Sequence, residues 1–365
     1  MTILYVLLAI FLFGIMILVH ELGHFTMARI FHVTIREFSI GMGPKIVSHL
    51  GKKSGIRYSL RLLPIGGFVS MVGEDEYAEE EGALNQKPVW QRICITAAGP
   101  VVNILCAILV MCISVSISPA LGSTRIHSFA ENTQVYSQQS GLCVNDVIIH
   151  VGNASVHTST QLSYEIMQQG SKSTQISQID NDNDGTVDAV TVVLPSLTVR
   201  RDGKTVVLEN VKFPGYVTAG HVFGDVDFTV WAENKSVGNV LKHAVYDSWN
   251  TFQVIWDSLV GLVGGHYSVR DMSGPIGVTD AISTAAQSGI ENLLYIFVLI
   301  SMNLGVFNLL PVPALDGGRL VFLLIEWIRG KPIDPRVEGY VHFVGICALL
   351  LLMVFVTFQD VVRLF

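Results

Sequence analysis

The amino-acid sequence predicts a multi-pass α-helical membrane protein that carries a globular α+β domain outside the membrane. Half of the 365 residues are hydrophobic and only 15 % are charged, which is unusual for a soluble protein. Four stretches are apolar over roughly 20 residues or more, the length of helix that crosses a bilayer core of about 30 Å. A long polar region, 118–290, separates the second stretch from the third.

The four predicted spans are 2–27, about 93–117, about 291–311 and about 338–358. A further apolar helical stretch, 315–329, is too short to span and is expected to pack against the third span. The predicted division is therefore 1–117 for the first two spans, 118–215 for the outer domain, 216–290 for a connector and 291–365 for the last two spans. In the second span, Gly99 and Asn103 are expected to allow close helix packing, with the amide bonding to another helix.

Basic residues in short loops predict the orientation, because such loops stay in the cytoplasm. The loops after the first and third spans are rich in them: Arg29, Arg36, Lys45, Lys52, Lys53, Arg57 and Arg61, then Arg319, Arg329, Lys331 and Arg336. Both loops are expected to be cytoplasmic. The region 118–290 and both termini are then extracytoplasmic.

The first cytoplasmic loop contains the stretch "IRYSLRLLPIGGFVSM", which alternates partly and then turns at Pro64–Gly67 before an apolar run. This pattern predicts a β-hairpin over 56–72 at the membrane surface. The net charge of −7 excludes nucleic acid as an expected partner and gives no pull toward anionic lipid. The contact with the bilayer is therefore expected to be hydrophobic.

The outer region opens with "SGLCVNDVIIHVGNASV", which resembles a PDZ domain, a fold that binds extended peptides at a sheet edge. Cys143 is its single cysteine, so a disulfide cannot hold this domain together and it must rely on its core. The stretch 237–262 has apolar residues three and four apart and predicts an amphipathic helix in the connector. Trp249 and Trp256 in this helix suit either the lipid interface or packing against the domain.

The first span ends with "HELGH", which places His20, Glu21 and His24 among apolar neighbours. A charged group deep in a bilayer costs about 2.5–3.5 kcal/mol, so it calls for a function. Residues four apart project from one helix face, and two imidazoles so placed can bind one zinc ion. Glu21 can then move a proton from a metal-bound water to a leaving amine. The alternative is two histidines on an ordinary packed helix.

Catalytic zinc takes a third protein ligand and leaves one position open. Most other histidines lie in the outer region, whereas Asp316 in "NLLPVPALDGGRL" stands at the cytoplasmic end of the third span. We expect Asp316 to be the third ligand. The alternative is that it caps the helix that follows.

The stretches "HELGH", "AAGPVVN" and "NLLPVPALDGG" together resemble the site-2 protease family of intramembrane zinc metalloproteases, most closely its RseP-type bacterial branch. The resemblance covers nearly the whole chain, and "SGPIGV" (273–278) and the final "DVVRLF" fit it too. It implies that His20, His24 and Asp316 bind zinc and that Glu21 activates water. It also implies that Asn308 holds the substrate strand, and that this chain is of the single-PDZ kind.

A peptide bond inside a transmembrane helix is shielded until the helix unwinds, and unwound backbone in lipid needs hydrogen-bond partners. We expect the substrate to be held as an added strand by the hairpin, at Gly67 and Val69, together with the Asn308 amide. By resemblance, the substrates are single-span proteins of a bacterial inner membrane, such as anti-sigma factors and signal-peptide remnants.

A departure from the family is "DNDNDGTVD", in which Asp180, Asp182 and Asp184 have calcium-loop spacing. Thr191 stands where that loop has its bidentate glutamate, so a polar insertion is favoured over weak Ca²⁺ binding.

Two other functions remain open from the residues. A metal transporter would also bury His and Asp in its spans, but it has no use for Glu21. A non-catalytic PDZ scaffold would have no need of a complete set of ligands and base.

Overall fold

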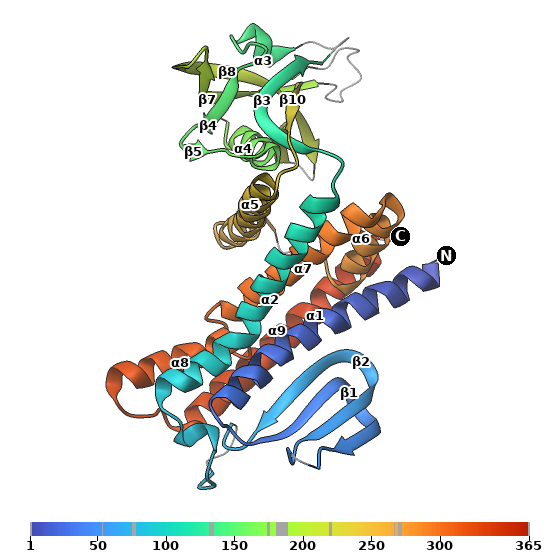
Figure 1. Cartoon of the computed structure of the whole chain (residues 1–365), viewed down its shortest axis with the longest axis vertical. Helices are drawn as coiled ribbons and strands as arrows, with labels where there is room; N and C mark the ends of the chain where they lie inside the picture. The colour runs from blue at the N-terminus through green and yellow to red at the C-terminus, as the bar shows by residue number, and fades with distance from the viewer. Residues whose placement is uncertain are drawn as a thin grey trace. The chain divides into compact units, whose positions relative to one another are not determined.

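The computed structural model describes residues 2–52, 54–74, 78–130, 135–173, 176–179, 189–218, 221–265, 267–268 and 272–363. The chain forms two compact units (Figure 1): a helical unit, 1–110 with 254–365, and a strand-rich unit, 111–253. Helices α2 (Val89–Ile117) and α5 (Val237–Val263) each run from one unit into the other.

The helical unit is built around helices that are long and apolar. It contains α1 (Thr2–Ile30), α6 (Pro275–Ser288), α7 (Ile290–Leu309), α8 (Asp316–Arg329) and α9 (Pro335–Arg363), together with parts of α2 and α5 and the short 3₁₀ helix Leu84–Gln86. Among the described residues, four helices are long and apolar enough to cross a membrane: α1, α2, α7 and α9. The first, second and fourth predicted spans fall within α1, α2 and α9, and the third, about 291–311, covers most of α7 and runs two residues past its end. Helix α8 has only 14 residues, in line with the prediction that it is too short to span.

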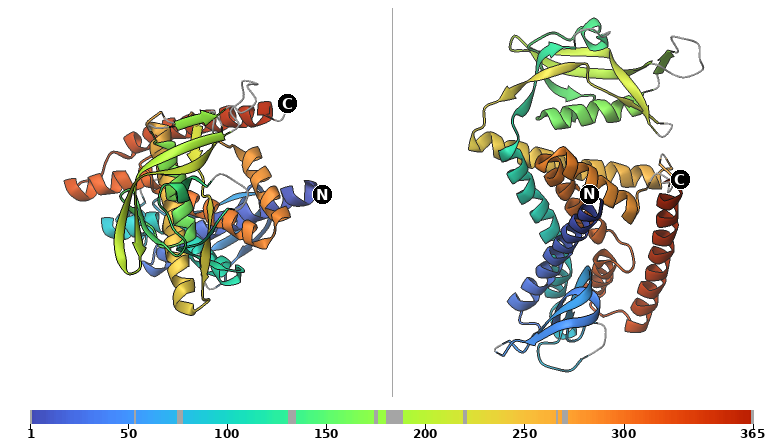
Figure 2. Two further views of the ribbon diagram at one scale, coloured as in Figure 1. Left: turned by 90° about the horizontal axis from the view of Figure 1, so that it is seen from above. Right: turned by 90° about the vertical axis from the view of Figure 1, so that its right-hand side faces the viewer.

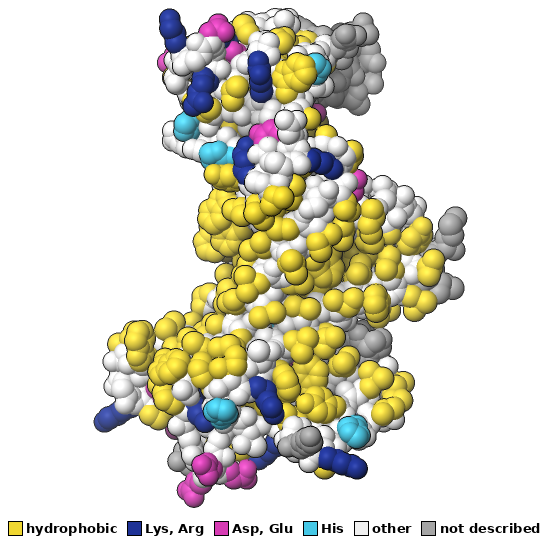
Figure 3. Space-filling view, in the orientation of Figure 1, with side chains coloured by type: hydrophobic (Ala, Val, Ile, Leu, Met, Phe, Trp, Pro, Cys, Tyr) yellow, Lys and Arg dark blue, Asp and Glu magenta, His cyan; other side chains and the backbone are white. Residues whose placement is uncertain are grey.

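The outer face of the helical unit is hydrophobic. Figure 3 shows apolar side chains spread over its helices, with charged side chains at the end that carries the small β-sheet. Leu109 and Phe343, on two of the long helices, are 62 % and 64 % exposed. Such a surface suits lipid as the surrounding solvent.

The first two long helices cross at a pair of glycines. A Cβ on Gly23 of α1 would collide with the carbonyl of Ala98, and it would lie 2.9 Å from the Cα of Gly99 on α2. Farther along α2, the Ser301 hydroxyl of α7 donates a hydrogen bond of 3.0 Å to the carbonyl of Asn103. The prediction that Gly99 allows close packing is confirmed, because the two backbones meet there.

The sheet of the helical unit differs from the predicted hairpin. Two long strands form it, β1 (Ile35–Leu50) and β2 (Arg57–Met71). Residues 57 and 70 of β2 both lie opposite Glu37, and residues 60 and 67 both lie opposite Ile40. The β2 strand therefore doubles back between Leu60 and Gly67, near the predicted turn.

The two halves of β2 do not pair with each other, because residues 37–40 of β1 lie between them. The prediction of a self-contained hairpin over 56–72 is therefore wrong. The sequence hides the missing strand, since Gly41, Gly43 and Pro44 interrupt any alternating pattern in 35–50. Phe38 and Val69 then pack with Ala28 of α1 and Ile95 of α2 in one buried apolar cluster.

A buried carboxylate joins α6 to α9. Asp360, 4 % exposed, accepts hydrogen bonds from the backbone N–H groups of Gly274, at 3.1 Å, and Gly277, at 2.9 Å. These N–H groups belong to the first turn of α6, where a helix lacks intrahelical partners. The stretches "SGPIGV" and "DVVRLF" thus meet in space.

The strand-rich unit is a mixed α+β fold with an eight-stranded sheet. Its elements are β3 (Leu121–Phe129), α3 (Tyr136–Gln139), β4 (Val147–Val151), β5 (Ala154–Ser155), α4 (Ser159–Ser171), β6 (Ile176–Ile179), β7 (Ala189–Arg201), β8 (Lys204–Thr218), β9 (His221–Gly224) and β10 (Phe228–Glu233). The main strand order is β10-β3-β4-β7-β8-β9, with β5 beside β4 and β6 beside β7, and all pairs are antiparallel. Two further views appear in Figure 2.

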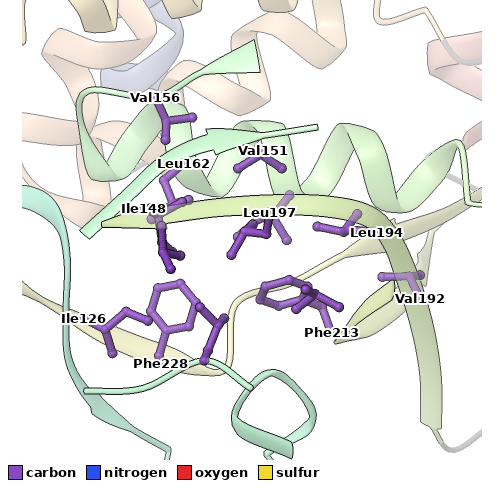
Figure 4. Close-up of a cluster of buried hydrophobic side chains, with 14 of the residues drawn as sticks. Ile126, Ile148, Val151, Val156, Leu162, Val192, Leu194, Leu197, Phe213 and Phe228 are labelled. Carbon is purple, nitrogen blue, oxygen red and sulfur yellow. The ribbon is translucent and has the colours of Figure 1, made fainter. Parts of the chain in front are cut away.

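The strand-rich unit has a large apolar core. Figure 4 shows side chains from the sheet and from α4 converging on Ile148, Leu197 and Phe213, all fully buried. The conspicuous sequence "SGLCVNDVI" contributes Leu142 and Ile148 to this core. Its Asp146 is buried too, and it accepts hydrogen bonds from the Cys143 N–H and the Arg201 guanidinium.

The predicted helix over 237–262 is found as α5. Its first half is tied to the strand-rich unit by a polar contact, in which the Thr158 hydroxyl donates to Asp247 at 2.7 Å. Trp249 and Trp256 are about half exposed. The Asp-rich stretch with Asp180, Asp182 and Asp184 lies outside the described residues. The predicted domain boundaries at 118, 215 and 290 stay predictions.

Candidate metal centre

The two histidines of "HELGH" lie one turn apart on α1 and face the same point. Their Nε2 atoms are 3.2 Å apart. His24 is 9 % exposed, so its ring is nearly enclosed by protein. The spacing of four residues therefore places both imidazoles as the sequence predicts.

Asp316 joins them from α8, almost 300 residues farther along the chain. Its Oδ2 lies 3.1 Å from Nε2 of His20 and 3.4 Å from Nε2 of His24. One ligand atom from each of the three residues lies within 4.8 Å of the other two. The capping alternative for Asp316 does not hold, because the N-cap position of α8 is Leu315 and the Asp316 carboxylate contacts the histidines.

The tautomer of His24 leaves its Nε2 free to bind a metal. Its Nδ1 lies 2.8 Å from the carbonyl oxygen of Ile95, which can only accept, so Nδ1 carries the proton. The Nε2 lone pair then points toward Asp316. A backbone carbonyl in this position is a common way to orient a metal-binding histidine.

Asn103 has the corresponding place beside His20. Its Nδ2 is 3.2 Å from Nδ1 of His20, while its Oδ1 is buried and has no hydrogen-bond partner among the described residues. The two ends of an amide have the same shape, and their assignment follows from the hydrogen bonds they make. Turning the amide over lets Oδ1 accept the Nδ1 proton, which satisfies the orphaned oxygen and frees Nε2 of His20.

These observations fit a zinc ion. Asp316 Oδ2 is buried without a hydrogen-bond donor among the described residues, as expected for an oxygen that binds a cation. Two imidazoles and one carboxylate form a donor set that catalytic zinc uses, with a fourth position left for water. His20, His24 and Asp316 would hold the ion.

A glycine on α2 makes room for the two rings. A Cβ on Gly99 would collide with Nε2 of His24 and lie 2.9 Å from Cε1 of His20. Any larger residue there would push the imidazoles out of place. Gly99 therefore serves the site as well as the helix crossing.

Glu21 lies beside the three candidate ligands in a cavity of about 360 Å³. The cavity is lined by the three ligands, Glu21, and residues from β2, α2, α8 and the neighbouring loops: Phe68, Val69, Met71, Glu74, Leu84, Ile95, Thr96, Ala314, Leu315 and Arg319. A carboxylate next to the metal position has the placement that a general base requires.

The β2 strand runs past Glu21. A Cβ on Gly67 would lie 3.3 Å from Cγ of Glu21, and Val69 lines the cavity. Residues 67–71 pair with residues 35–40 of β1, and β1 is the only strand that pairs with β2 among the described residues. This half of β2 is an edge of the sheet beside the candidate base. Asn308, half-buried in the last turn of α7, is not among the described residues that line the cavity.

Sequence reasoning missed an ion pair at the rim of the cavity. Arg319 Nη1 lies 2.6 Å from Oε1 of Glu74, and Glu74 Oε2 accepts a 3.3 Å bond from the N–H of Met71, at the end of β2. Arg319 is three residues after Asp316 on α8 and therefore shares its helix face. The spacing of "DGGR" indicates that Arg319 lies near Asp316. Nothing in the sequence indicates that Glu74 is the partner of Arg319. The expected bond of Asn103 to another helix is confirmed, but its partner, the candidate zinc ligand His20, was not predicted.

The chain is similar to known proteins over nearly its whole length. The model of peptidase family M50 matches residues 8–352. The chain is 30 % identical to the regulator of sigma-W protease RasP of Bacillus subtilis and 30 % identical to the zinc metalloprotease RasP of Bacillus licheniformis, each over 98 % of both chains. A Clostridium acetobutylicum protein named provisionally as a zinc metalloprotease is 32 % identical over 98 % of this chain and 97 % of its own.

The match covers the whole arrangement described above, from α1 with both histidines to α8 with Asp316 and into α9. The chain therefore belongs to peptidase family M50, the site-2 protease family, and is a metalloprotease.

Proposed function

We propose that this protein is an intramembrane zinc protease that cuts single-span membrane proteins within their transmembrane segments. The observation that carries the proposal is the convergence of His20, His24 and Asp316 beside Glu21, in a unit that contains long apolar helices. The substrate classes named by resemblance, anti-sigma factors and signal-peptide remnants, are part of the proposal.

His20, His24 and Asp316 would hold the zinc, and Ile95 and Asn103 would orient the two imidazoles. Zinc, when bound, supplies a water of lowered pKa and polarises the scissile carbonyl. Glu21 takes a proton from the attacking water and gives it to the leaving amine. The buried surroundings exclude bulk water and strengthen these interactions.

The edge of β2 would hold the substrate. A substrate strand that pairs with residues 67–71 would pass directly beside Glu21, and its exposed backbone would gain the partners it needs in lipid. Replacing Val69 with proline removes a backbone N–H from this strand and leaves the three proposed ligands intact. We expect slower cleavage with unchanged bound zinc, whereas unchanged turnover would exclude this mode of binding.

The strand-rich unit is proposed to be a PDZ domain that screens substrates outside the cytoplasm of a bacterial cell, with both termini on the same side. The basic loops after the first and third predicted spans support this orientation. Cys143 is exposed in this unit and offers a direct test. In a variant that keeps only Cys143, a membrane-impermeant maleimide should label spheroplasts; labelling only after lysis would reverse the orientation.

The function itself is tested by comparing the wild type with Glu21→Gln on a tagged single-span substrate in liposomes. The variant should keep its zinc and lose about 10²- to 10⁴-fold in cleavage rate, because it lacks the base. Zinc uptake into the liposomes that survives the substitution, with no cleavage by either protein, would instead indicate a transporter.

A further inference from the structure

Helix α9 is the long helix that the protein encloses least. Only 11 % of its apolar stretch is buried, against 33 % for α7, and Figure 2 shows α9 in red along one side of the helical unit. At its C-terminal end Asp360 holds the start of α6. At its other end, a single histidine reaches toward the metal site.

That histidine is His342, and its partner is the backbone of the segment that carries the aspartate ligand. The N–H of Ala314 donates a hydrogen bond of 2.9 Å to Nδ1 of His342. An amide nitrogen can only donate, so Nδ1 is the acceptor and a neutral ring carries its proton on Nε2. The His342 ring also packs against Phe322 of α8, with ring centroids 5.7 Å apart.

Ala314 needs an outside partner because of the sequence around it. Pro311 and Pro313 have no N–H, while the amides of Leu310, Val312 and Leu315 bond to carbonyls in their own segment. The N–H of Ala314 instead bonds to a helix that begins about 20 residues later. The hydrogen bond from Ala314 to His342 therefore connects the 310–315 segment to α9, whereas the other amides of this segment bond locally.

The backbone at Ala314 is also strained. Its φ is +78°, in the left-handed region that residues with a Cβ rarely adopt. Such a conformation persists only where the surrounding structure imposes it. Ala314 lines the metal cavity, and Asp316 follows two residues later.

A close contact reinforces the hydrogen bond. Gly345, one turn after His342 on α9, faces Pro313, and a Cβ there would lie 2.7 Å from the carbonyl oxygen of Pro313. The helix therefore approaches the 312–316 segment at two neighbouring points. Helix packing at Gly345 brings His342 within reach of Ala314.

We propose that His342 is a positioning residue for the metal site: it holds Ala314 in the left-handed conformation and thereby sets the Asp316 carboxylate against the two imidazoles. This inference rests on the proposed function, since it concerns the ion that His20, His24 and Asp316 would share. It adds the last long helix to the groups that determine metal affinity. Supporting groups around metal ligands typically contribute 10- to 100-fold in affinity.

The test measures zinc affinity of the full chain in detergent, by competition with a chelating dye. We expect His342→Leu to bind zinc about 10- to 100-fold more weakly. His342→Asn, whose side-chain oxygen can replace Nδ1 as acceptor, should stay close to the wild type. Phe343→Leu, at a neighbouring position that is 64 % exposed, is the matched control and should not change affinity.

A second substitution separates positioning from general helix stability. Glycine adopts a φ of +78° without strain, so Ala314→Gly in the His342→Leu background should recover roughly tenfold of the lost affinity. Gly345→Ala should weaken zinc binding even though His342 is intact, which covers the case in which His342→Leu does not fold.

Wild-type affinity in both His342→Leu and Gly345→Ala would overturn the inference. It would also be overturned if His342→Leu bound weakly and neither asparagine nor Ala314→Gly restored binding. In both cases zinc bound by the wild type, and lost in Asp316→Ala, would leave the proposed function standing. A wild type that binds no zinc would remove both.

Discussion

The two units of this protein differ in how far they expose large apolar side chains. The strand-rich unit encloses an apolar core that includes Ile148, Leu197 and Phe213, as soluble domains do. The helical unit leaves Leu109 and Phe343 largely exposed, while Asn103 and Ser301 are fully buried. Lipid is as apolar as the interior of the helical unit, so apolar side chains can lie inside the unit or on its surface. A polar group that is buried in this unit therefore points to function.

The largest expected effect comes from adding one methyl group beside the buried histidines. In Gly99→Ala, the new Cβ would collide with Nε2 of His24, and neighbouring helix backbone leaves no room to shift. We expect zinc affinity and proteolysis to fall at least about 100-fold, as for loss of a ligand's support. Gly339→Ala is the control, because a Cβ there meets nothing within 4 Å. Equal zinc content in the two variants would contradict the arrangement of α1 against α2.

The next effect compares an apolar side chain buried in the strand-rich unit with one exposed on the helical unit. Phe213→Ala removes a fully buried ring from the strand-rich unit and should destabilise that unit by about 3–5 kcal/mol. Leu109→Ala, at an exposed position of α2, should change stability little. We expect the Leu109 side chain to face lipid both in the folded protein and after unfolding within the membrane. Thermal unfolding followed by tryptophan fluorescence would show the difference. If Leu109→Ala were as damaging as Phe213→Ala, the outer face of α2 would not be a lipid-facing surface.

A smaller effect is expected at the ion pair between Glu74 and Arg319. This pair connects the end of β2 to the helix that carries Asp316. Charge reversal at either residue should lower kcat/KM about tenfold, since an ion pair near such a site contributes of the order of 1–2 kcal/mol. The exchanged double variant, Glu74→Arg with Arg319→Glu, should recover part of the loss. Additive losses in the double variant would show that the two residues act separately.

The smallest effect concerns the exposed sheet of the helical unit. Burial alone raises the pKa of Glu37, but hydrogen bonds from Lys45 and Arg61 outweigh it and lower the pKa to about 2. Because the folded pKa lies below the ordinary value of 4.5, these bonds stabilise the fold above pH 4.5 and are lost as the pH falls toward 2.

Glu37→Gln should therefore melt slightly below the wild type near neutral pH, and the difference should vanish toward pH 2. A difference in melting temperature that stays constant across this range would argue against the ion pair as its source.

The sequence alone predicts those features of the protein that depend on residues close together in the chain. The four apolar stretches and the histidines four residues apart follow from periodicities within one helix, and each appears in the structure. Asp316 could be named by resemblance and by its expected depth in the membrane. The strand β1 could not, because Gly41, Gly43 and Pro44 interrupt the alternation that marks a strand.

Partners between distant elements were also out of reach. Asn103 against His20, Glu74 against Arg319 and His342 against Ala314 each depend on which helix faces meet. A single sequence records the faces of each helix but not how the helices cross. The structure therefore adds to the site these contacts between residues that are far apart in the sequence.

Residues from α1 and α8 would together hold one zinc ion, and X-ray absorption at the zinc edge of the purified protein would reveal the atoms that bind it. We predict one zinc per chain, with two imidazole nitrogens at about 2.0–2.1 Å and oxygen in the remaining positions. In Asp316→Ala the ion should be lost or bound far more weakly. Sulfur in the zinc's coordination shell, or zinc that remains equally tightly bound after Asp316→Ala, would rule out a site formed by His20, His24 and Asp316.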